Sequence, residues 1–175
     1  RKRFDQAHKH SLIQGTPPSH QTRMCGQKAA SEHAQNFQSD DQLRLLPSEY
    51  RPLLNKFYRA HRSHMRAPAG ARCWVAGTTE IVAALCLSSV ENGYWLSGLL
   101  VAPEQRKKGL GARLVARAVS ENSGPVWLFC VPELVSFYRR LGFNESMVLP
   151  EALASRLQRY NSNRTLIALR HDNER

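Results

Sequence analysis

The stretch Pro103-Glu104-Gln105-Arg106-Lys107-Lys108-Gly109-Leu110-Gly111 decides the interpretation of this sequence. It follows an apolar, strand-like run at residues 95–102 and opens a helix-like run at residues 112–119. Backbone N–H groups at the start of a helix bind anions, and the helix dipole favours negative charge there. Glycines let the backbone approach a phosphate closely, and the three adjacent cations add positive charge. The turn therefore predicts a phosphate site, although an ordinary strand-to-helix turn with a solvated basic edge has the same local pattern.

Two motifs resemble those of the GNAT (Gcn5-related) N-acyltransferases. Residues 106–111, Arg-Lys-Lys-Gly-Leu-Gly, are similar to the family's R/Q-x-x-G-x-G/A motif, and residues 101–103 are similar to its V-x-P lead-in. Residues 137–143, Phe-Tyr-Arg-Arg-Leu-Gly-Phe, resemble its F-Y-x-x-x-G-F signature. The similarity extends from Cys73 to about Phe143. It implies the GNAT fold, an α/β (α+β) domain with a central mixed, mostly antiparallel sheet flanked by helices.

The resemblance also implies an N-acetyltransferase that moves an acetyl group from acetyl-CoA to a primary amine by direct attack. The pyrophosphate is expected at residues 106–111, and the pantetheine arm between strand ends at residues 99–101 and 129–130. The backbone N–H of Leu100 is the implied oxyanion donor, and Tyr138 is the implied general acid. A second interpretation of Tyr138 is a helix aromatic that packs beside Phe137. The residues expected to bind acetyl-CoA are Leu99, Leu100, Val101, Arg106, Lys107, Lys108, Gly109, Leu110, Gly111, Ala112, Cys130 and Tyr138.

The chain departs from the family pattern at several positions. Several relatives use a glutamate on the strand before the motif as general base, and residues 94–101 contain none. Val131 and Leu134 stand where many members have asparagine and alanine, and Lys107 replaces a frequent glycine. A water chain, or an acceptor amine of low pKa, is therefore expected to replace the base. A CoA-binding domain with impaired catalysis is a further interpretation.

The charge balance suggests an alternative partner. The 175 residues carry 25 Lys and Arg against 14 Asp and Glu, a formal net charge of +11. Such a surface suits nucleic acid, an anionic membrane or a polyanionic ligand. Coenzyme A accounts for part of this excess. An RNA- or tRNA-binding protein, including a tRNA-directed acetyltransferase, is the alternative, but no RNA-binding motif is present.

The length and composition predict one folded domain at residues 41–175. Residues 1–40 are polar and are expected to be a disordered or non-native extension. The sequence shows no signal peptide and no apolar run of membrane-spanning length, so a cytoplasmic location without a membrane partner is expected. Cys73, Cys86 and Cys130 lie in apolar runs and are expected to be buried free thiols, with no metal site. A homodimer is left open, as is the identity of the amine.

Hydrophobic periodicity predicts the elements around the motifs. A basic segment at residues 59–64 is either an acceptor wall or a solvated helix face. The expected strands are residues 42–46, 72–76, 80–87, 94–101, 126–130 and 165–169, and the expected helices are one long helix from Pro47 to about Arg66, then residues 110–119, 132–141 and 150–160.

Overall fold

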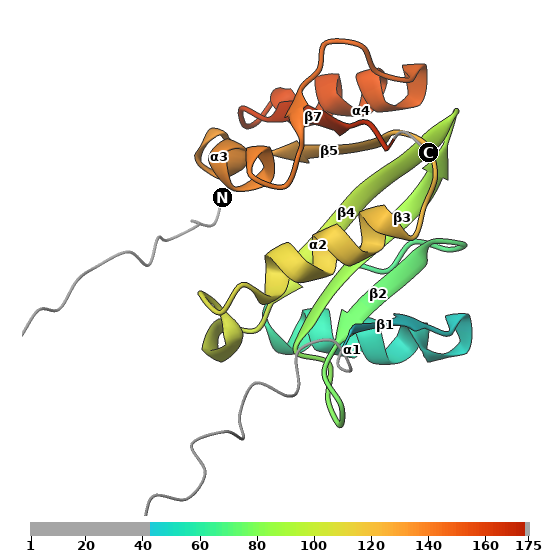
Figure 1. Ribbon diagram of the computed structural model, residues 1–175, viewed down its shortest axis with the longest axis vertical. Helices are drawn as coiled ribbons and strands as arrows, with labels where there is room; N and C mark the ends of the chain where they lie inside the picture. The colour runs from blue at the N-terminus through green and yellow to red at the C-terminus, as the bar shows by residue number, and fades with distance from the viewer. Residues whose placement is uncertain (1–42, 174–175) are drawn as a thin grey trace, which may run out of the picture. The chain divides into compact units, whose positions relative to one another are not determined.

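The protein is described here by a computed structural model, which places residues 43–173 (Figure 1). The expected extension at residues 1–40 lies outside the described residues. Seven strands form one sheet: β1 (Leu43–Leu46), β2 (Arg72–Ala76), β3 (Ala83–Val90), β4 (Gly93–Val101), β5 (Val126–Cys130), β6 (Asn144–Glu145) and β7 (Ile167–His171). The helices are α1 (Arg51–Ala60), α2 (Leu110–Ser120), α3 (Val135–Arg139) and α4 (Glu151–Asn161). Among residues 43–173, none of the helices is long and apolar enough to cross a lipid bilayer.

The sheet has the strand order β1-β2-β3-β4-β5-β7-β6. Strands β1 to β4 form an antiparallel meander, and β5, β7 and β6 pair antiparallel. The two halves meet through a parallel pairing of β4 with β5. A crossover that contains α2 connects these two strands, as parallel pairing requires. The mixed, mostly antiparallel sheet flanked by helices confirms the expected fold class.

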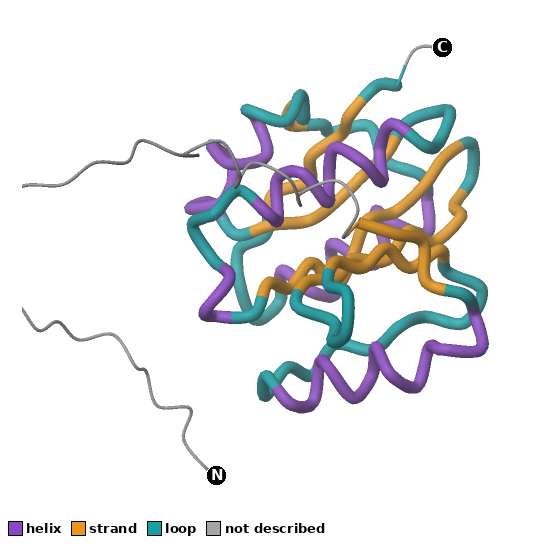
Figure 2. Tube along the Cα trace, turned by 60° about the horizontal axis from the view of Figure 1, so that its bottom comes forward, coloured by secondary structure: helices purple, strands orange, loops and turns teal. Residues whose placement is uncertain are grey.

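Side chains of the sheet alternate between two hydrophobic clusters, one on each face. The larger cluster joins β2 to β5 with α2 and α3 and contains Leu85, Leu114 and Phe143. The smaller cluster packs α1 on the opposite face and contains Leu54, Tyr58 and Cys86. Figure 2 shows helices on both sides of the strands. The two faces of β4 therefore meet different helices.

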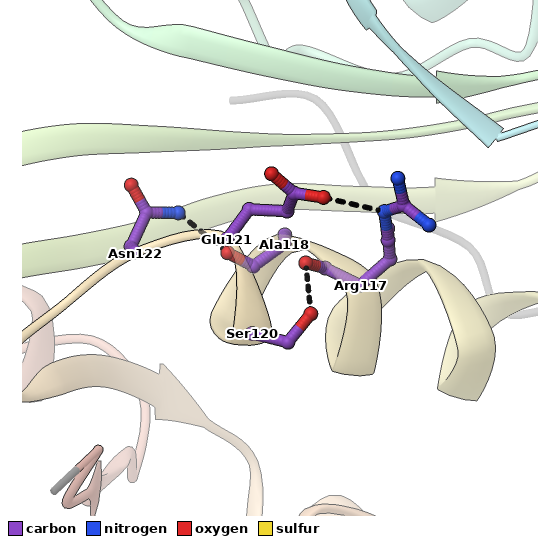
Figure 3. Close-up of polar contacts among 5 residues, drawn as sticks. All are labelled: Arg117, Ala118, Ser120, Glu121 and Asn122. Carbon is purple, nitrogen blue, oxygen red and sulfur yellow. Dashed lines mark hydrogen bonds and ion pairs between the residues drawn. The ribbon is translucent and has the colours of Figure 1, made fainter. Parts of the chain in front are cut away.

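Side-chain hydrogen bonds close the C-terminal end of α2 (Figure 3). Asn122 donates from its side-chain amide to the carbonyl oxygen of Ala118, and Ser120 Oγ donates to the carbonyl oxygen of Arg117 at 2.9 Å. Arg117 also pairs with Glu121 at 3.0 Å, four residues on. Asn122 is the one buried polar residue in the described part of the chain. These contacts fix the end of the helix whose other end carries the motif.

The first helix is shorter than expected, because α1 ends at Ala60. Arg62 adopts a φ of 55°, and the N–H of Ser63 donates to the carbonyl oxygen of Tyr58 at 2.9 Å. Farther along, the N–H of Ala67 donates to Asn55 Oδ1 at 2.9 Å. The left-handed residue stops the helix, and the Asn55 side chain then holds the loop against it. The expectation that this helix continues to about Arg66 is therefore wrong, since it ends at Ala60.

A bulge interrupts the pairing of β4 with β3. Leu100 pairs with Ala84 and Ser97 pairs with Cys86, so Gly98 and Leu99 have no partner in the β3 register. Gly98 has a φ of +66°, and an added Cβ would lie 2.7 Å from the Tyr58 hydroxyl oxygen. That hydroxyl donates to the carbonyl oxygen of Gly98 at 2.7 Å. The α1 helix therefore supports the bulge from behind through Tyr58.

Replacing Tyr58 with phenylalanine should destabilise the fold by about 1–3 kcal/mol, because the Gly98 carbonyl would lose its donor in a buried setting. Urea denaturation monitored by circular dichroism measures the change in unfolding free energy. Tyr50→Phe is the matched control, since the Tyr50 side chain is 50% exposed. Equal stability of the two variants would contradict the support that we assign to Tyr58.

Candidate active site

The two halves of the sheet separate beyond a short contact. Strands β4 and β5 pair only through Tyr94 with Val126 and Trp95 with Trp127. Figure 1 shows the strands diverging from that end. Leu99–Val101 on one strand and Phe129–Cys130 on the other, the two ends expected to flank pantetheine, have no ladder between them. Their facing backbone groups are thus available to a ligand that enters the opening.

The turn before α2 presents unpaired backbone N–H groups. Lys107 and Gly109 adopt left-handed φ values of 61° and 74°, and Gly109 is the N-cap of α2. In the described part of the chain, no hydrogen bond uses the N–H of Lys107, Lys108 or Gly109. The first N–H groups of α2 are also without helical acceptors. Successive N–H groups of this kind form a concave anion site.

The cations of the motif surround this turn. Arg106 Nε donates to the carbonyl oxygen of Val101 at 2.9 Å, which ties the turn to the end of β4. Lys108 Nζ donates to Gln105 Oε1 at 3.3 Å. Within residues 43–173, neither these two side chains nor Lys107 forms an ion pair with a carboxylate. Their charge is thus free to attract a polyanion.

The two motifs meet at Gly111. An added Cβ at Gly111 would lie 3.3 Å from Val101 Cγ2 and 4.0 Å from Phe137 Cζ. Glycine therefore lets the start of α2 lie close to the end of β4 and to the second motif. The Leu110 side chain is buried in the core, so this residue can offer a ligand only its backbone. Ala112 completes the first turn of α2.

Tyr138 lies within an aromatic cluster and remains protonated at neutral pH. Its ring packs edge-on against Phe137 at 4.9 Å and Phe143 at 5.8 Å between centroids. Burial raises the pKa of the Tyr138 phenol, and interaction with the Cys130 thiolate raises it further. The phenol therefore keeps its proton within reach of Cys130, the last residue of β5. Packing beside Phe137 and proton donation both remain compatible with this position.

The backbone does not support the expected role of Leu100 as oxyanion donor. Ala102 donates its N–H to the carbonyl oxygen of Val82 at 2.8 Å, toward β3. Because N–H directions alternate along a strand, the N–H of Leu100 also points toward β3. Leu99 lies in the bulge without a β3 partner. A glycine inside a strand pattern signals such a bulge, so Gly98 was the available clue.

The glutamates near the meander lie away from the opening. Glu80 lines a pocket beside α1 with Arg44 and Leu53, and Glu91 is exposed in the turn between β3 and β4. Ser97 is half-buried on β4. In the basic segment, His61 packs on the Phe57 ring at 4.8 Å. The described residues therefore place no glutamate of the meander in the position of a general base.

Cys73, Cys86 and Cys130 are buried free thiols, as expected from the sequence. The titration of Cys130 is linked to folding. Burial, and then the charge of Glu145, raise the pKa of Cys130 from 9.0 to about 11. A raised pKa in the folded state contributes stability below pH 9 and loses it between pH 9 and about 11.

Between pH 9 and about 11, the unfolding free energy of Cys130→Ala should therefore decrease less than that of the wild type. The difference in unfolding free energy between the wild type and Cys130→Ala should be constant at pH 6–8 and decrease from pH 9 to about 11. Urea denaturation at each pH measures it. A difference that stays constant to pH 11 would show that the thiol titrates alike in both states.

Comparisons with known proteins agree with this geometry. The sequence profile described as "Acetyltransferase (GNAT) domain" matches residues 69–145. No curated protein matches the sequence. An aminoglycoside 6'-N-acetyltransferase complexed with coenzyme A superposes with a TM-score of 0.58 at 14% identity, over 76% of this chain and 97% of that chain. ElaA of Escherichia coli gives a TM-score of 0.56 at 13% identity, over 75% and 99% of the two chains.

A larger protein is also similar. N-acetylglutamate synthase from Neisseria gonorrhoeae, complexed with coenzyme A and N-acetyl-glutamate, gives a TM-score of 0.56 at 17% identity. The match covers 76% of this chain and 35% of that chain. Because the sequence identities are low, these similarities show the fold alone. The family assignment rests on the profile match to residues 69–145. The chain thus contains a domain of the GNAT acetyltransferase family.

Proposed function

We propose that the protein is an acyl-CoA-dependent N-acyltransferase that moves an acetyl group from acetyl-CoA to a primary amine. The observation that supports this proposal most is the meeting of both motifs at one opening. A Cβ added at Gly111 of the first motif would lie 4.0 Å from Phe137 Cζ of the second and 3.3 Å from Val101 Cγ2, near the place where β4 leaves β5. A phosphorylated, extended thioester would place its phosphates at the free N–H groups of the turn and its arm in the opening.

The residues of the turn would hold the pyrophosphate. The N–H groups of residues 107–112 would donate to its oxygens, and Arg106, Lys107 and Lys108 would neutralise its charge. The exposed edges of β4 and β5 would then pair with the amides of the pantetheine arm, as a strand end pairs with an extended ligand.

The reaction would proceed by direct attack. The amine nitrogen attacks the thioester carbonyl carbon, and the C–S bond breaks when the tetrahedral intermediate collapses. We assign the oxyanion to the N–H of Leu99, in place of Leu100, because the bulge frees it from β3. Tyr138 gives its proton to the leaving thiolate, and water removes the proton of the attacking amine.

Incubation with acetyl-CoA and amines of different classes tests the proposal. A lysine peptide, a polyamine, an aminoglycoside and an amino acid cover the main classes. Free thiol is followed colorimetrically, and the acetylated amine is identified by mass spectrometry. Amine-dependent thiol release with a matching acetylated product supports the proposal. Binding of acetyl-CoA without transfer to any amine would instead favour a CoA-binding domain with impaired catalysis.

The proposal includes a cytoplasmic location, which rests on the buried free thiols. The RNA-binding alternative gains no specific support. Trp74 and Trp127 are buried in the described part of the chain, so they offer no stacking surface to bases.

A further inference from the structure

A second pocket lies on the face of β4 opposite α2. It has a volume of about 530 Å³, and its lining includes Ser88, Ser89, Trp95, Arg156, Arg159 and Tyr160. The serines belong to β3, Trp95 to β4, and the other three residues to α4. Pro68, from the loop after α1, also contributes. Segments that are distant in sequence thus form one cavity.

The wall of this pocket is aromatic. Trp95 packs against Phe129 of β5 at 6.0 Å between centroids, and Phe129 packs edge-on against Tyr160 at 6.5 Å. The Arg156 guanidinium lies 4.1 Å from the centroid of the Trp95 ring. A cation over an indole face is held by the ring quadrupole, so Arg156 has a defined place in the wall.

The pocket carries positive charge that the described residues do not neutralise. Arg156 and Arg159 form no ion pair within residues 43–173. No aspartate or glutamate lines the cavity. Two guanidinium groups near one cavity attract an anion, and each can donate two parallel hydrogen bonds to a carboxylate or phosphate.

Two buried polar atoms of the lining residues have no partner. Ser88 Oγ and Trp95 Nε1 make no hydrogen bond with any described residue. Ser88 and Trp95 face each other across the β3–β4 ladder. A buried donor without an acceptor destabilises the fold. A ligand oxygen that reached these atoms would offset part of this destabilisation.

The pocket lies beside the closed end of the β4–β5 opening. Trp95 is the last β4 residue paired with β5, so the opening begins just beyond it. The bulge at Leu99 follows four residues later, roughly 13 Å along the strand. On the other face, α2 and α3 side chains fill the space over these strands. On the Trp95 face, α1 covers the bulge through Tyr58, so an amine held in the pocket would reach the thioester along the opening between β4 and β5.

We infer that this pocket binds an anionic group, a phosphate or a carboxylate, on the amine acceptor. Arg156 and Arg159 hold the anion, and the amine extends along β4 to the thioester. The two arginines are thus specificity-determining residues for the acceptor. This inference rests on the proposed function for the role of the amine, while anion binding by the pocket is independent of it.

Three amines that share an eight-carbon chain test the inference: 8-aminooctyl phosphate, 8-aminooctanoate and 8-amino-1-octanol. Calorimetry measures their binding to the full chain without acetyl-CoA, and steady-state kinetics measures kcat/KM with it. The variants are Arg159→Gln and the double variant Arg156→Gln/Arg159→Gln. Arg140→Gln is the matched control, because Arg140 is an exposed arginine beside α3 without an ion pair.

At least one anionic amine should bind the wild type about tenfold more tightly than the alcohol, a difference of about 1.4 kcal/mol, because an anionic oxygen accepts stronger hydrogen bonds from the guanidinium groups. The double variant should lose this preference, and Arg159→Gln should lose part of it. Arg140→Gln should keep it, and the KM for acetyl-CoA should stay unchanged in every variant. The stronger of the two anionic amines identifies the group that the pocket accepts.

Equal binding of all three amines to the wild type would overturn the inference, even if acetyl transfer occurs. Anion preference without transfer to any amine would support the pocket and count against the proposed function. Binding of total tRNA that depends on both arginines, with no preference among the amines, would also overturn the inference.

Discussion

Gly109→Trp should weaken acetyl-CoA binding at least 100-fold, a loss of about 2.7 kcal/mol. Gly109 has a φ of +74°, a conformation that costs other residues about 1–2 kcal/mol, and it is the N-cap of α2. An indole at this position would also cover the unpaired N–H groups of the turn. Calorimetry with the full chain measures the dissociation constant.

Gly70→Trp is a closely matched control. Gly70 has a φ of +73°, and an added Cβ at either glycine would meet no atom within 4 Å. Both substitutions thus introduce the same backbone strain and the same side chain, and both should lower the melting temperature by a similar amount. If the two variants bound acetyl-CoA equally well, the turn before α2 would not be the phosphate site.

Tyr138→Phe should lower kcat about 100-fold, the usual contribution of a general acid, with little change in the KM for acetyl-CoA. The ring keeps its contacts with Phe137 and Phe143, so the variant should fold. Steady-state thiol release with the best amine found for the wild type measures both constants. Because burial raises the pKa of Tyr138 above its ordinary value of 10.0, its deprotonation should not reduce wild-type activity below pH 10.

Tyr94→Phe is the control that separates the loss of the Tyr138 proton from the general effect of removing a tyrosine hydroxyl. Tyr94 packs on the same face of the sheet, at the paired end of β4 with β5. Its kcat should remain within about twofold of the wild type. An unchanged kcat in Tyr138→Phe would assign Tyr138 a packing role, and protonation of the thiolate would then fall to water.

The local features of the motif half could be predicted from sequence. Glycine and helix-start patterns placed the turn at Gly109 and the start of α2, and the continuous apolar run at residues 126–130 placed β5. The Asn92-Gly93 pair is a typical hairpin-turn sequence, and Asn92 adopts a φ of 59° in the turn between β3 and β4. Each of these features depends on residues within a few positions of one another.

Features that depend on distant contacts could not be predicted. The end of α1 depends on a left-handed Arg62, although Arg62, Met65 and Arg66 are good helix formers. The direction of the Leu100 N–H follows from the β3 register and from the bulge that Tyr58 supports. The two-residue β6 has no periodicity of its own and exists through its pairing with β7.

The pocket lined by Trp95, Arg156 and Arg159 could not be predicted from the sequence either. Arg156 and Trp95 are 61 residues apart in the chain, and neither belongs to a motif. Their contact forms only because β5 lies between β4 and β7 and because α4 packs on the Trp95 face. Charge alone does not reveal such a site, since the sequence carries 25 lysines and arginines in all.

Hydrogen–deuterium exchange with and without acetyl-CoA tests the central claim most directly, because exchange reports on individual backbone N–H groups. Acetyl-CoA should slow exchange at residues 107–112, where the N–H groups lack partners, and at Leu99 in the β4 bulge. Leu100 should change little, because it pairs with Ala84 and its N–H points toward β3. Unchanged exchange at residues 107–112 under saturating acetyl-CoA, or protection confined to other segments, would contradict an acyl-CoA site in the β4–β5 opening.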